Sequence, residues 1–194
     1  MPRLSRILFA TLAGVACLAM TPDAKAQSFF DQLFGMSGSG QSGRQTVRFP
    51  GAHAPGTIIV SFGDRRLYFI EARGRAISYP IAIPKSEARW AGVSYVSQKR
   101  ENPSWTPTPQ MRRENPKLPP FVPGGDPRNP MGVRALYLGS SLYRIHGTDA
   151  PWLIGQEVSK GCIRMYNDDV IHLYQRARVG ARVVVTWQRF GTMS

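Results

Sequence analysis

The chain is predicted to fold as a mainly β protein, built from mostly antiparallel strands with one or two short helices. Short runs rich in β-branched residues, separated by glycine-containing turns, occupy residues 57–83 and indicate a strand meander. A helical pattern of apolar residues occurs near residues 168–178. Between these regions, residues 101–132 hold nine prolines, which remove too many backbone donors for a regular element.

Residues 1–26 are predicted to form a secretory signal peptide. Arg3 and Arg6 make a basic start, an uncharged apolar run follows, and Ala24-Lys25-Ala26 supplies the small residues of a cleavage site. We therefore expect export and a periplasmic location. Cleavage after Ala26 leaves Cys162 as the one cysteine of the mature chain, so no internal disulfide can form.

Residues 27–56 are expected to be a flexible leader, because they contain a run of glycine and serine. The folded domain then spans residues 57–190. The signal peptide carries +2 of the chain's net charge of +13, so the exported protein carries +11. Such a charge favours acidic partners, and export argues against nucleic acid. Anionic lipid and an acidic cell-wall polymer both stay open as partners.

The domain is predicted to begin with an antiparallel meander. Gly63-Asp64 and Ala72-Arg73-Gly74 supply its turns, and the apolar residues between them favour strands. A further strand precedes the proline-rich stretch. The expected strands cover residues 57–62, 66–70, 76–83 and 90–98.

The proline-rich stretch 101–132 is predicted to lack regular structure and to wall a substrate cleft. Long irregular segments inside compact domains are usually functional or disordered. Trp105, Met111 and Phe121 indicate that this one packs against the domain. The alternative is that this segment is a surface loop without a function.

Two strands over residues 133–138 and 142–146 are expected to form a hairpin that ends at His146. Cys162 comes sixteen residues later, after a loop whose glycines and proline allow it to double back. A thiol beside an imidazole forms a nucleophilic thiolate at neutral pH, because the imidazolium stabilises the anion. An inert buried cysteine is the alternative, and the glycine-flanked, polar surroundings of Cys162 disfavour it.

A helix and a strand are predicted to complete the domain. Asn167 can cap a helix over about residues 168–178, and Gly180 can end it. The last strand, over residues 181–187, lacks alternation, so we expect it to be buried on both faces.

No metal and no cofactor are expected. The three histidines, His53, His146 and His172, show no pair with metal-ligand spacing. We expect His172 to be a surface or boundary residue of the last helix. We therefore do not expect a zinc peptidase.

The motif His146-Gly147-Thr148, followed by Ser159-Lys160-Gly161-Cys162-Ile163-Arg164-Met165, resembles the signature of the L,D-transpeptidases with a YkuD-like catalytic domain. Residues 105–108 and 129–138 are similar to family segments that precede the histidine. Lys160 stands where the family often has histidine. The resemblance implies a YkuD-like β-sandwich or barrel, a catalytic domain over residues 57–190, and an exported cysteine enzyme that acts on peptidoglycan stem peptides.

By this resemblance, Cys162 attacks the carbonyl that joins the L-centre of meso-diaminopimelate to the terminal D-alanine of a tetrapeptide stem. D-alanine leaves, and an amine resolves the thioester. His146 is the expected base and then acid, and the family implies that the Gly147 carbonyl orients its ring. Gly161 lets backbone amides approach the oxyanion.

Arg164 is expected to bind a substrate carboxylate through its planar fork, with a structural ion pair to Asp168 or Asp169 as the alternative. Ser159 and Thr148 are expected to bind substrate or to stabilise their turns.

The acyl acceptor stays open. A stem amine gives a 3-3 cross-link, a lysine attaches an outer-membrane protein or lipoprotein, and water makes the enzyme an L,D-carboxypeptidase. A non-catalytic peptidoglycan-binding module is the alternative from another class. The intact pair of His146 and Cys162 favours an enzyme.

Overall fold

The computed structural model describes residues 42–191, so the predicted signal peptide and most of the Gly/Ser-rich run lie outside the described residues. This part of the chain forms a ten-stranded sheet with two α-helices and two short 3-10 helices. The predicted mainly β class is confirmed. Among residues 42–191, no helix has the length and apolar character needed to cross a membrane.

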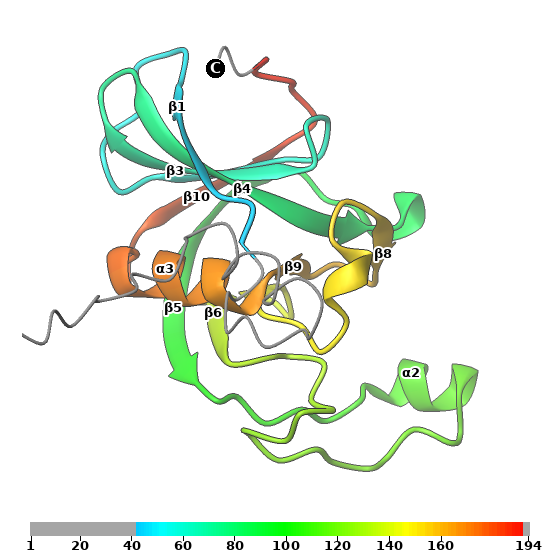
Figure 1. The fold of residues 1–194 in the computed structure, drawn as a ribbon. Helices are drawn as coiled ribbons and strands as arrows, with labels where there is room; N and C mark the ends of the chain where they lie inside the picture. Colours follow the sequence, from blue (N-terminus) through cyan, green and yellow to red (C-terminus); the bar gives the residue numbers. More distant parts are fainter. Residues whose placement is uncertain (1–41, 192–194) are drawn as a thin grey trace, which may run out of the picture. The chain divides into compact units, whose positions relative to one another are not determined.

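The elements follow one another along the chain as Figure 1 labels them. In order they are β1 (Gln45–Arg48), β2 (Ile58–Ser61), β3 (Arg66–Ala72), β4 (Arg75–Pro84), η1 (Ser86–Ala88), β5 (Gly92–Glu101), α2 (Pro109–Glu114), β6 (Arg134–Leu138), β7 (Arg144–His146), η2 (Pro151–Leu153), β8 (Glu157–Ser159), β9 (Ile163–Met165), α3 (Asn167–Arg176) and β10 (Arg182–Thr186).

The sheet closes on itself. Its strands run in the order β4-β3-β2-β10-β5-β6-β7-β9, and β9 pairs again with β4. Most neighbours are antiparallel, as predicted, whereas β10–β2, β4–β8 and β7–β9 are parallel. The β7–β9 pair aligns Ile145 with Ile163 and His146 with Arg164. This register brings the end of the predicted hairpin beside the segment that carries the cysteine.

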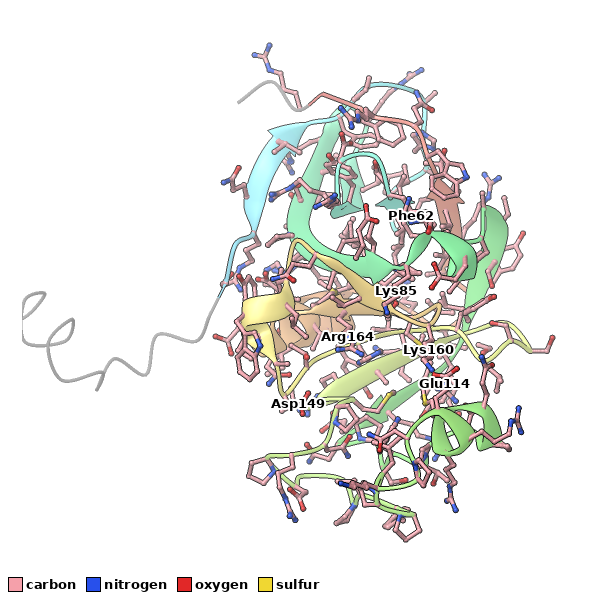
Figure 2. All side chains as sticks on the ribbon, turned by 90° about the vertical axis from the view of Figure 1, so that its right-hand side faces the viewer. Phe62, Lys85, Glu114, Asp149, Lys160 and Arg164 are labelled. Carbon is pink, nitrogen blue, oxygen red and sulfur yellow. The ribbon has the colours of Figure 1, made fainter. Side chains whose placement is uncertain are left out.

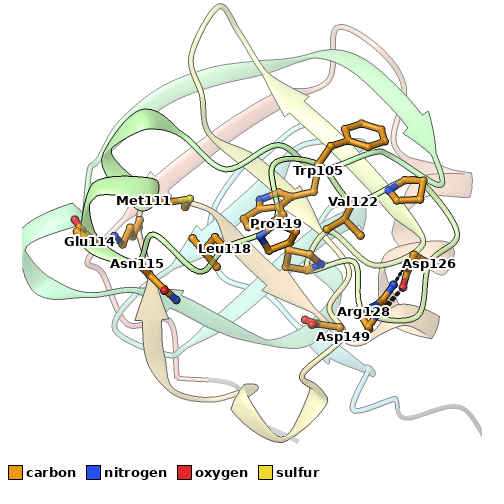
Figure 3. Close-up of a pocket in the computed structure, with 14 residues that line it drawn as sticks. Trp105, Met111, Glu114, Asn115, Leu118, Pro119, Val122, Asp126, Arg128 and Asp149 are labelled. Atoms are coloured by element: carbon orange, nitrogen blue, oxygen red, sulfur yellow. Dashed lines mark hydrogen bonds and ion pairs between the residues drawn. The ribbon is translucent and has the colours of Figure 1, made fainter.

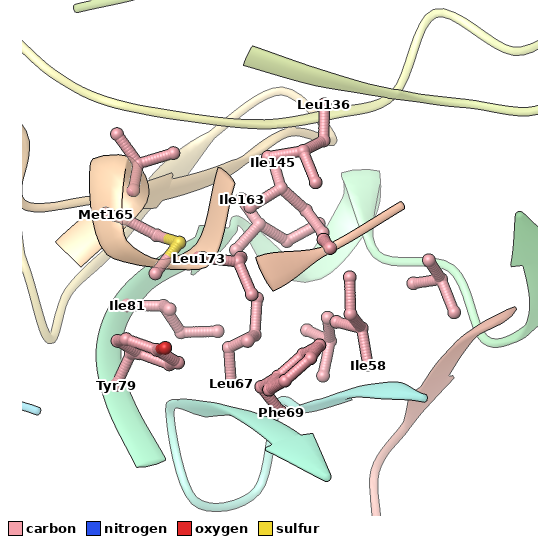
Figure 4. Close-up of a cluster of buried hydrophobic side chains, with 14 of the residues drawn as sticks. Ile58, Leu67, Phe69, Tyr79, Ile81, Leu136, Ile145, Ile163, Met165 and Leu173 are labelled. Atoms are coloured by element: carbon pink, nitrogen blue, oxygen red, sulfur yellow. The ribbon is translucent and has the colours of Figure 1, made fainter. Parts of the chain in front are cut away.

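A single large hydrophobic cluster joins strands of the closed sheet to α3 (Figure 4). Val170 and Leu173 of α3 are fully buried in it. Burying one such side chain contributes about 1.5–3 kcal/mol, so this apolar face holds α3 against the sheet. On β10, Val183 and Val185 belong to this cluster, whereas Val184 packs, partly buried, against a second one. The two clusters explain why the last strand lacks alternation.

The strand β1 was not predicted. It lies within the segment 27–56 expected to be a leader, and it pairs antiparallel with the edge of β4 opposite β3. Only Val47 of its four residues is buried, so its sequence carries a weak strand signal. Just before it, Ser42 Oγ and Gly43 N donate to the fully buried carboxylate of Asp169, at 2.5 and 3.1 Å.

The proline-rich stretch contains a helix, so the prediction of no regular element there was wrong. Thr108 caps α2, its Oγ1 accepting a hydrogen bond from Met111 N at 3.2 Å. Pro109 follows in the first turn, where the missing N–H costs nothing. The rest of the stretch is irregular apart from an isolated bridge between Trp105 and Val122. The three-residue strands β8 and β9 were also not predicted.

Candidate active site

His146 and Cys162 line the same cavity, of about 860 Å³. One wall comes from β7 and the residues around β8 and β9, and the other from the proline-rich segment and α2. Trp105 and Met111 lie on this second wall, so the prediction that residues 101–132 wall the cleft is confirmed for them. The full lining is Ser104, Trp105, Thr106, Thr108, Pro109, Gln110, Met111, Arg113, Pro130, Met131, Tyr137, Ser141, Leu142, Tyr143, Arg144, His146, Ser159, Lys160, Cys162 and Arg164.

A second cavity, of about 750 Å³, lies under the proline-rich segment (Figure 3). It shares Trp105, Met111, Pro130 and Lys160 with the first cavity. Phe121 lines it, whereas His146 and Cys162 do not. Phe121 therefore walls the neighbouring cavity rather than the one that contains Cys162.

His146 ends β7 and is buried. Its Nδ1 lies 2.6 Å from Gly147 O. A carbonyl oxygen only accepts, so Nδ1 carries the proton and Nε2 keeps its lone pair. Gly147 thus lies where the resemblance implied, and the ring is held in the tautomer that a general base needs.

The electrostatics of the pair differ from the sequence-based expectation of an imidazolium beside a thiolate. Burial lowers the pKa of His146 to about 3, and the positive charge of Arg164 acts in the same direction. Burial also raises the pKa of the Cys162 thiol, against the opposing hydrogen bonds and charge of Arg144 and the charge of Arg164. Burial therefore works against the charged form of each group.

The loop that carries Cys162 is braced by its own side chains. Cys162 Sγ donates to Leu142 O at 3.7 Å, which ties the thiol to the hairpin before β7. Ser159 Oγ, buried, donates to Cys162 O at 2.5 Å and accepts from Gly161 N at 3.4 Å. Ser159 therefore stabilises the turn, one of the two roles predicted for it, while it also lines the cavity.

Gly161 contacts two aromatic residues whose rings stack on each other. Trp90 and Tyr143 stack with their centroids 4.7 Å apart, and Trp90 Nε1 donates to Gly161 O at 3.1 Å. Gly161 has a φ of +123°, and a Cβ there would come within 2.3 Å of the Tyr143 ring. Only glycine fits this backbone conformation and this space.

The prediction that Asn167 caps α3 was wrong. Tyr166 occupies the cap position, and Asn167 is the first residue of the helix. Its Oδ1 accepts from Thr148 N at 3.1 Å and Val133 N at 3.4 Å, and its Nδ2 donates to Thr148 O at 3.0 Å. The side chain thus ties the segment after His146 to the segment before β6.

Thr148 is buried and lies outside the lining of the cavity with His146 and Cys162. Its Oγ1 accepts from Ala150 N at 3.0 Å. Of its two predicted roles, the geometry favours the turn over contact with substrate.

Arg164 lines the cavity without an acidic partner. Within residues 42–191 it makes no ion pair with Asp168 or Asp169, and its buried Nε has no hydrogen-bond partner. Asp169 is held instead by Ser42, Gly43 and Arg44. The alternative of a structural ion pair to either aspartate is therefore wrong.

Three further cations, Arg113, Arg144 and Lys160, line the cavity. Lys160 forms an ion pair with Glu114 at the end of α2, and Figure 2 shows the two side chains close together with Arg164 nearby. Arg144, on β7, was not singled out from the sequence. Arg144 lies at the cavity because β7 pairs parallel with β9, and the sequence carries no local signal for that pairing.

The other two histidines lie away from this site. His172 Nδ1 is 2.8 Å from Tyr79 Oη, and His53 packs edge-on against Phe49. In the described part of the chain, no three His, Cys, Asp or Glu side chains come together in a group able to hold a metal ion.

Residues 55–185 match the model of the YkuD family, described as an L,D-transpeptidase catalytic domain. In Escherichia coli (strain K12), "Probable L,D-transpeptidase ErfK/SrfK" is 44% identical and "Probable L,D-transpeptidase YbiS" 39% identical, each over 135 residues. These matches cover 66% and 65% of this chain and 43% of each relative, so the chain spans less than half the length of these relatives.

The solved catalytic domain of the E. faecium L,D-transpeptidase has a TM-score of 0.53 at 20% identity, with 70% of this chain and 100% of that chain covered. At this identity the likeness shows the fold, which confirms the expected YkuD-like β-sandwich or barrel. Because the family model covers more than half of the chain, the protein belongs to the L,D-transpeptidase family.

Proposed function

We propose that the protein is an L,D-transpeptidase that forms a thioester on Cys162 with tetrapeptide stems of peptidoglycan. The observation that carries the proposal is the pair itself: His146 and Cys162 line one cavity, and Gly147 O accepts from Nδ1, which leaves the lone pair of the ring on Nε2. Membership of the family supports the choice of substrate. The predicted signal peptide supports a periplasmic location.

In the first half of the reaction, His146 Nε2 takes the thiol proton as Cys162 Sγ attacks the carbonyl carbon before D-alanine. We assign stabilisation of the developing oxyanion to backbone N–H groups of the loop that carries Cys162, other than that of Gly161, which donates to Ser159 Oγ. When the tetrahedral species collapses, the carbon–nitrogen bond breaks, and His146 returns its proton to the leaving amine of D-alanine. The thioester remains on Cys162. Burial makes the imidazole of His146 a weak base, so the thiol proton moves to Nε2 as the sulfur–carbon bond forms rather than before it.

In the second half, an amine attacks the thioester carbonyl. His146 takes a proton from the attacking amine and returns it to the leaving sulfur, which restores the thiol. An acceptor amine on another stem gives a 3-3 cross-link, and a lysine of an outer-membrane protein or lipoprotein gives attachment of that protein. Water as acceptor makes the enzyme an L,D-carboxypeptidase. Arg164 holds a substrate carboxylate through its unpartnered guanidinium, while Ser159, Gly161 and Thr148 keep the loops in place.

Incubation with purified disaccharide-tetrapeptides tests the proposal. We expect release of D-alanine together with dimers linked between two diaminopimelate residues, and neither product with Cys162→Ala. Tripeptides without dimers would identify water as the acceptor. Binding of the tetrapeptide with no D-alanine released by the wild type would instead favour the non-catalytic peptidoglycan-binding module.

A further inference from the structure

Every charged residue that lines the cavity with His146 and Cys162 is a cation. Arg113, Arg144, Lys160 and Arg164 line it, and no aspartate or glutamate does. The neighbouring cavity has a mixed lining, since Glu114, Asp126 and Asp149 line it together with Arg128 and Lys160. The positive lining therefore belongs to the reactive cavity and is not a general property of this face.

Three of these four cations lack an acidic partner within residues 42–191. Lys160 pairs with Glu114, but no ion pair involves Arg113, Arg144 or Arg164. Arg144 NH1 donates to Leu142 O at 2.8 Å, and its guanidinium lies 4.9 Å from the centre of the Tyr137 ring. Neither contact neutralises the charge. Like charges that line one cavity favour an anionic ligand.

The arginines are distributed around the nucleophile. Arg144 lies two residues before His146 on β7, and Arg164 lies two residues after Cys162 on β9. Both act on the thiol, because their charges lower its pKa against the effect of burial. Arg113 projects from α2 on the opposite wall. Cations on both walls can bind carboxylates at two places on one ligand.

The proposed donor carries carboxylates in such an arrangement. Its terminal D-alanine has a free carboxylate on the leaving side of the scissile bond. The diaminopimelate residue is joined through its L-centre, so the carboxylate of its second centre is free unless it is amidated. Guanidinium groups bind carboxylates in bidentate fashion and have no such pairing with a carboxamide.

We propose that Arg113, Arg144 and Arg164 make this cavity selective for anionic donors, so that stems with free carboxylates acylate Cys162 and amidated stems do so poorly. The inference rests on the proposed function for the identity of the donor. The charge selectivity itself is a property of the cavity, and it is measurable without any peptidoglycan substrate.

The first experiment compares alkylation of Cys162 by iodoacetate and by iodoacetamide, reagents that differ in charge. The ratio of the two rates is divided by the same ratio for free cysteine. We expect the wild type to favour iodoacetate by about tenfold, the effect of one charge-assisted hydrogen bond, and the preference to fall as salt is added. A normalised ratio of one or less would overturn the proposal.

Variants assign the effect to the arginines. Arg144→Gln and Arg113→Gln should each lower the normalised ratio, and Arg144→Lys should keep much of it because the charge remains. Arg112→Gln is the matched control, since Arg112 lies on the same helix and outside the cavity lining. Thermal melting separates a folding defect in Arg144→Gln from a loss of selectivity. Equal ratios in the wild type, Arg144→Gln and Arg113→Gln would contradict the role of these two residues.

The second experiment offers matched tetrapeptide donors, one with free carboxylates and one with the second diaminopimelate carboxylate as a carboxamide. We expect the amidated donor to acylate the wild type about tenfold more slowly. Equal rates would overturn the selectivity while the proposed function stands. No acylation by either donor would overturn the proposed function, and the alkylation ratio would still decide whether the cavity selects anions.

Discussion

Asn167→Ala should destabilise the protein and loosen the segment that orients His146. The side chain makes hydrogen bonds at 3.1, 3.0 and 3.4 Å to the backbone of Thr148 and Val133. Each such bond contributes about 1 kcal/mol net, the longest one least. Alanine has a higher helix propensity, which returns about 0.6 kcal/mol at the start of α3. We therefore expect a net loss of about 2 kcal/mol of unfolding free energy.

Urea denaturation followed by tryptophan fluorescence measures this loss. The matched control is Asn115→Ala, because Asn115 Oδ1 accepts one exposed hydrogen bond from Lys117 N at 3.1 Å, and we expect a change below about 0.5 kcal/mol. D-alanine release by Asn167→Ala should also fall under conditions where the variant stays folded, since Gly147 O lies in the loosened segment. A midpoint and activity equal to those of the wild type would refute the reasoning.

Three further changes have distinct expected outcomes. Gly161→Ala should cost more unfolding free energy than Gly155→Ala, because both have a positive φ but only Gly161 lies against the Tyr143 ring; equal costs in urea denaturation would contradict this. Burial holds the folded-state pKa of His146 below 6.5, so as pH falls below that value the unfolded state takes up the proton first. The wild type should therefore lose stability relative to His146→Gln by up to about 1.4 kcal/mol per pH unit. If the unfolding free energies of the two proteins change in parallel with pH, this prediction is wrong. Arg164→Lys should lower turnover more than melting temperature, because lysine keeps the charge and loses the bidentate fork; unchanged turnover would mean that the fork is not used.

The longer strands of the fold were predictable because their signals are local. The apolar run that became β4 reads as a strand by itself, and so do the runs of β2 and β3. The strands β8 and β9 have three residues each, and their pairing with β4 and β7 depends on distant parts of the chain. The helix α2 was missed although Thr108-Pro109 is a helix-start signal, because the surrounding prolines outweighed it.

The site was predictable to a similar degree. Motif spacing was enough to expect His146 and Cys162 near one another, and the structure places both in one cavity. The effect of burial on the pKa values of His146 and Cys162 was not predictable, because only the folded domain creates that burial. Arg144 was missed for the same reason: two strands far apart in sequence must pair before its place beside Cys162 becomes visible.

Intact-protein mass spectrometry after incubation with a tetrapeptide donor tests the proposed chemistry most directly. The account predicts that the wild type gains the mass of the donor less D-alanine, on Cys162, while Cys162→Ser and Cys162→Ala gain nothing. His146→Ala should form the adduct slowly at neutral pH and faster at alkaline pH, where the thiol ionises without a base; because burial raises the pKa of Cys162, this increase should come above the pKa of a free thiol, about 8.5. Turnover of the donor by Cys162→Ala at the wild-type rate would contradict the account.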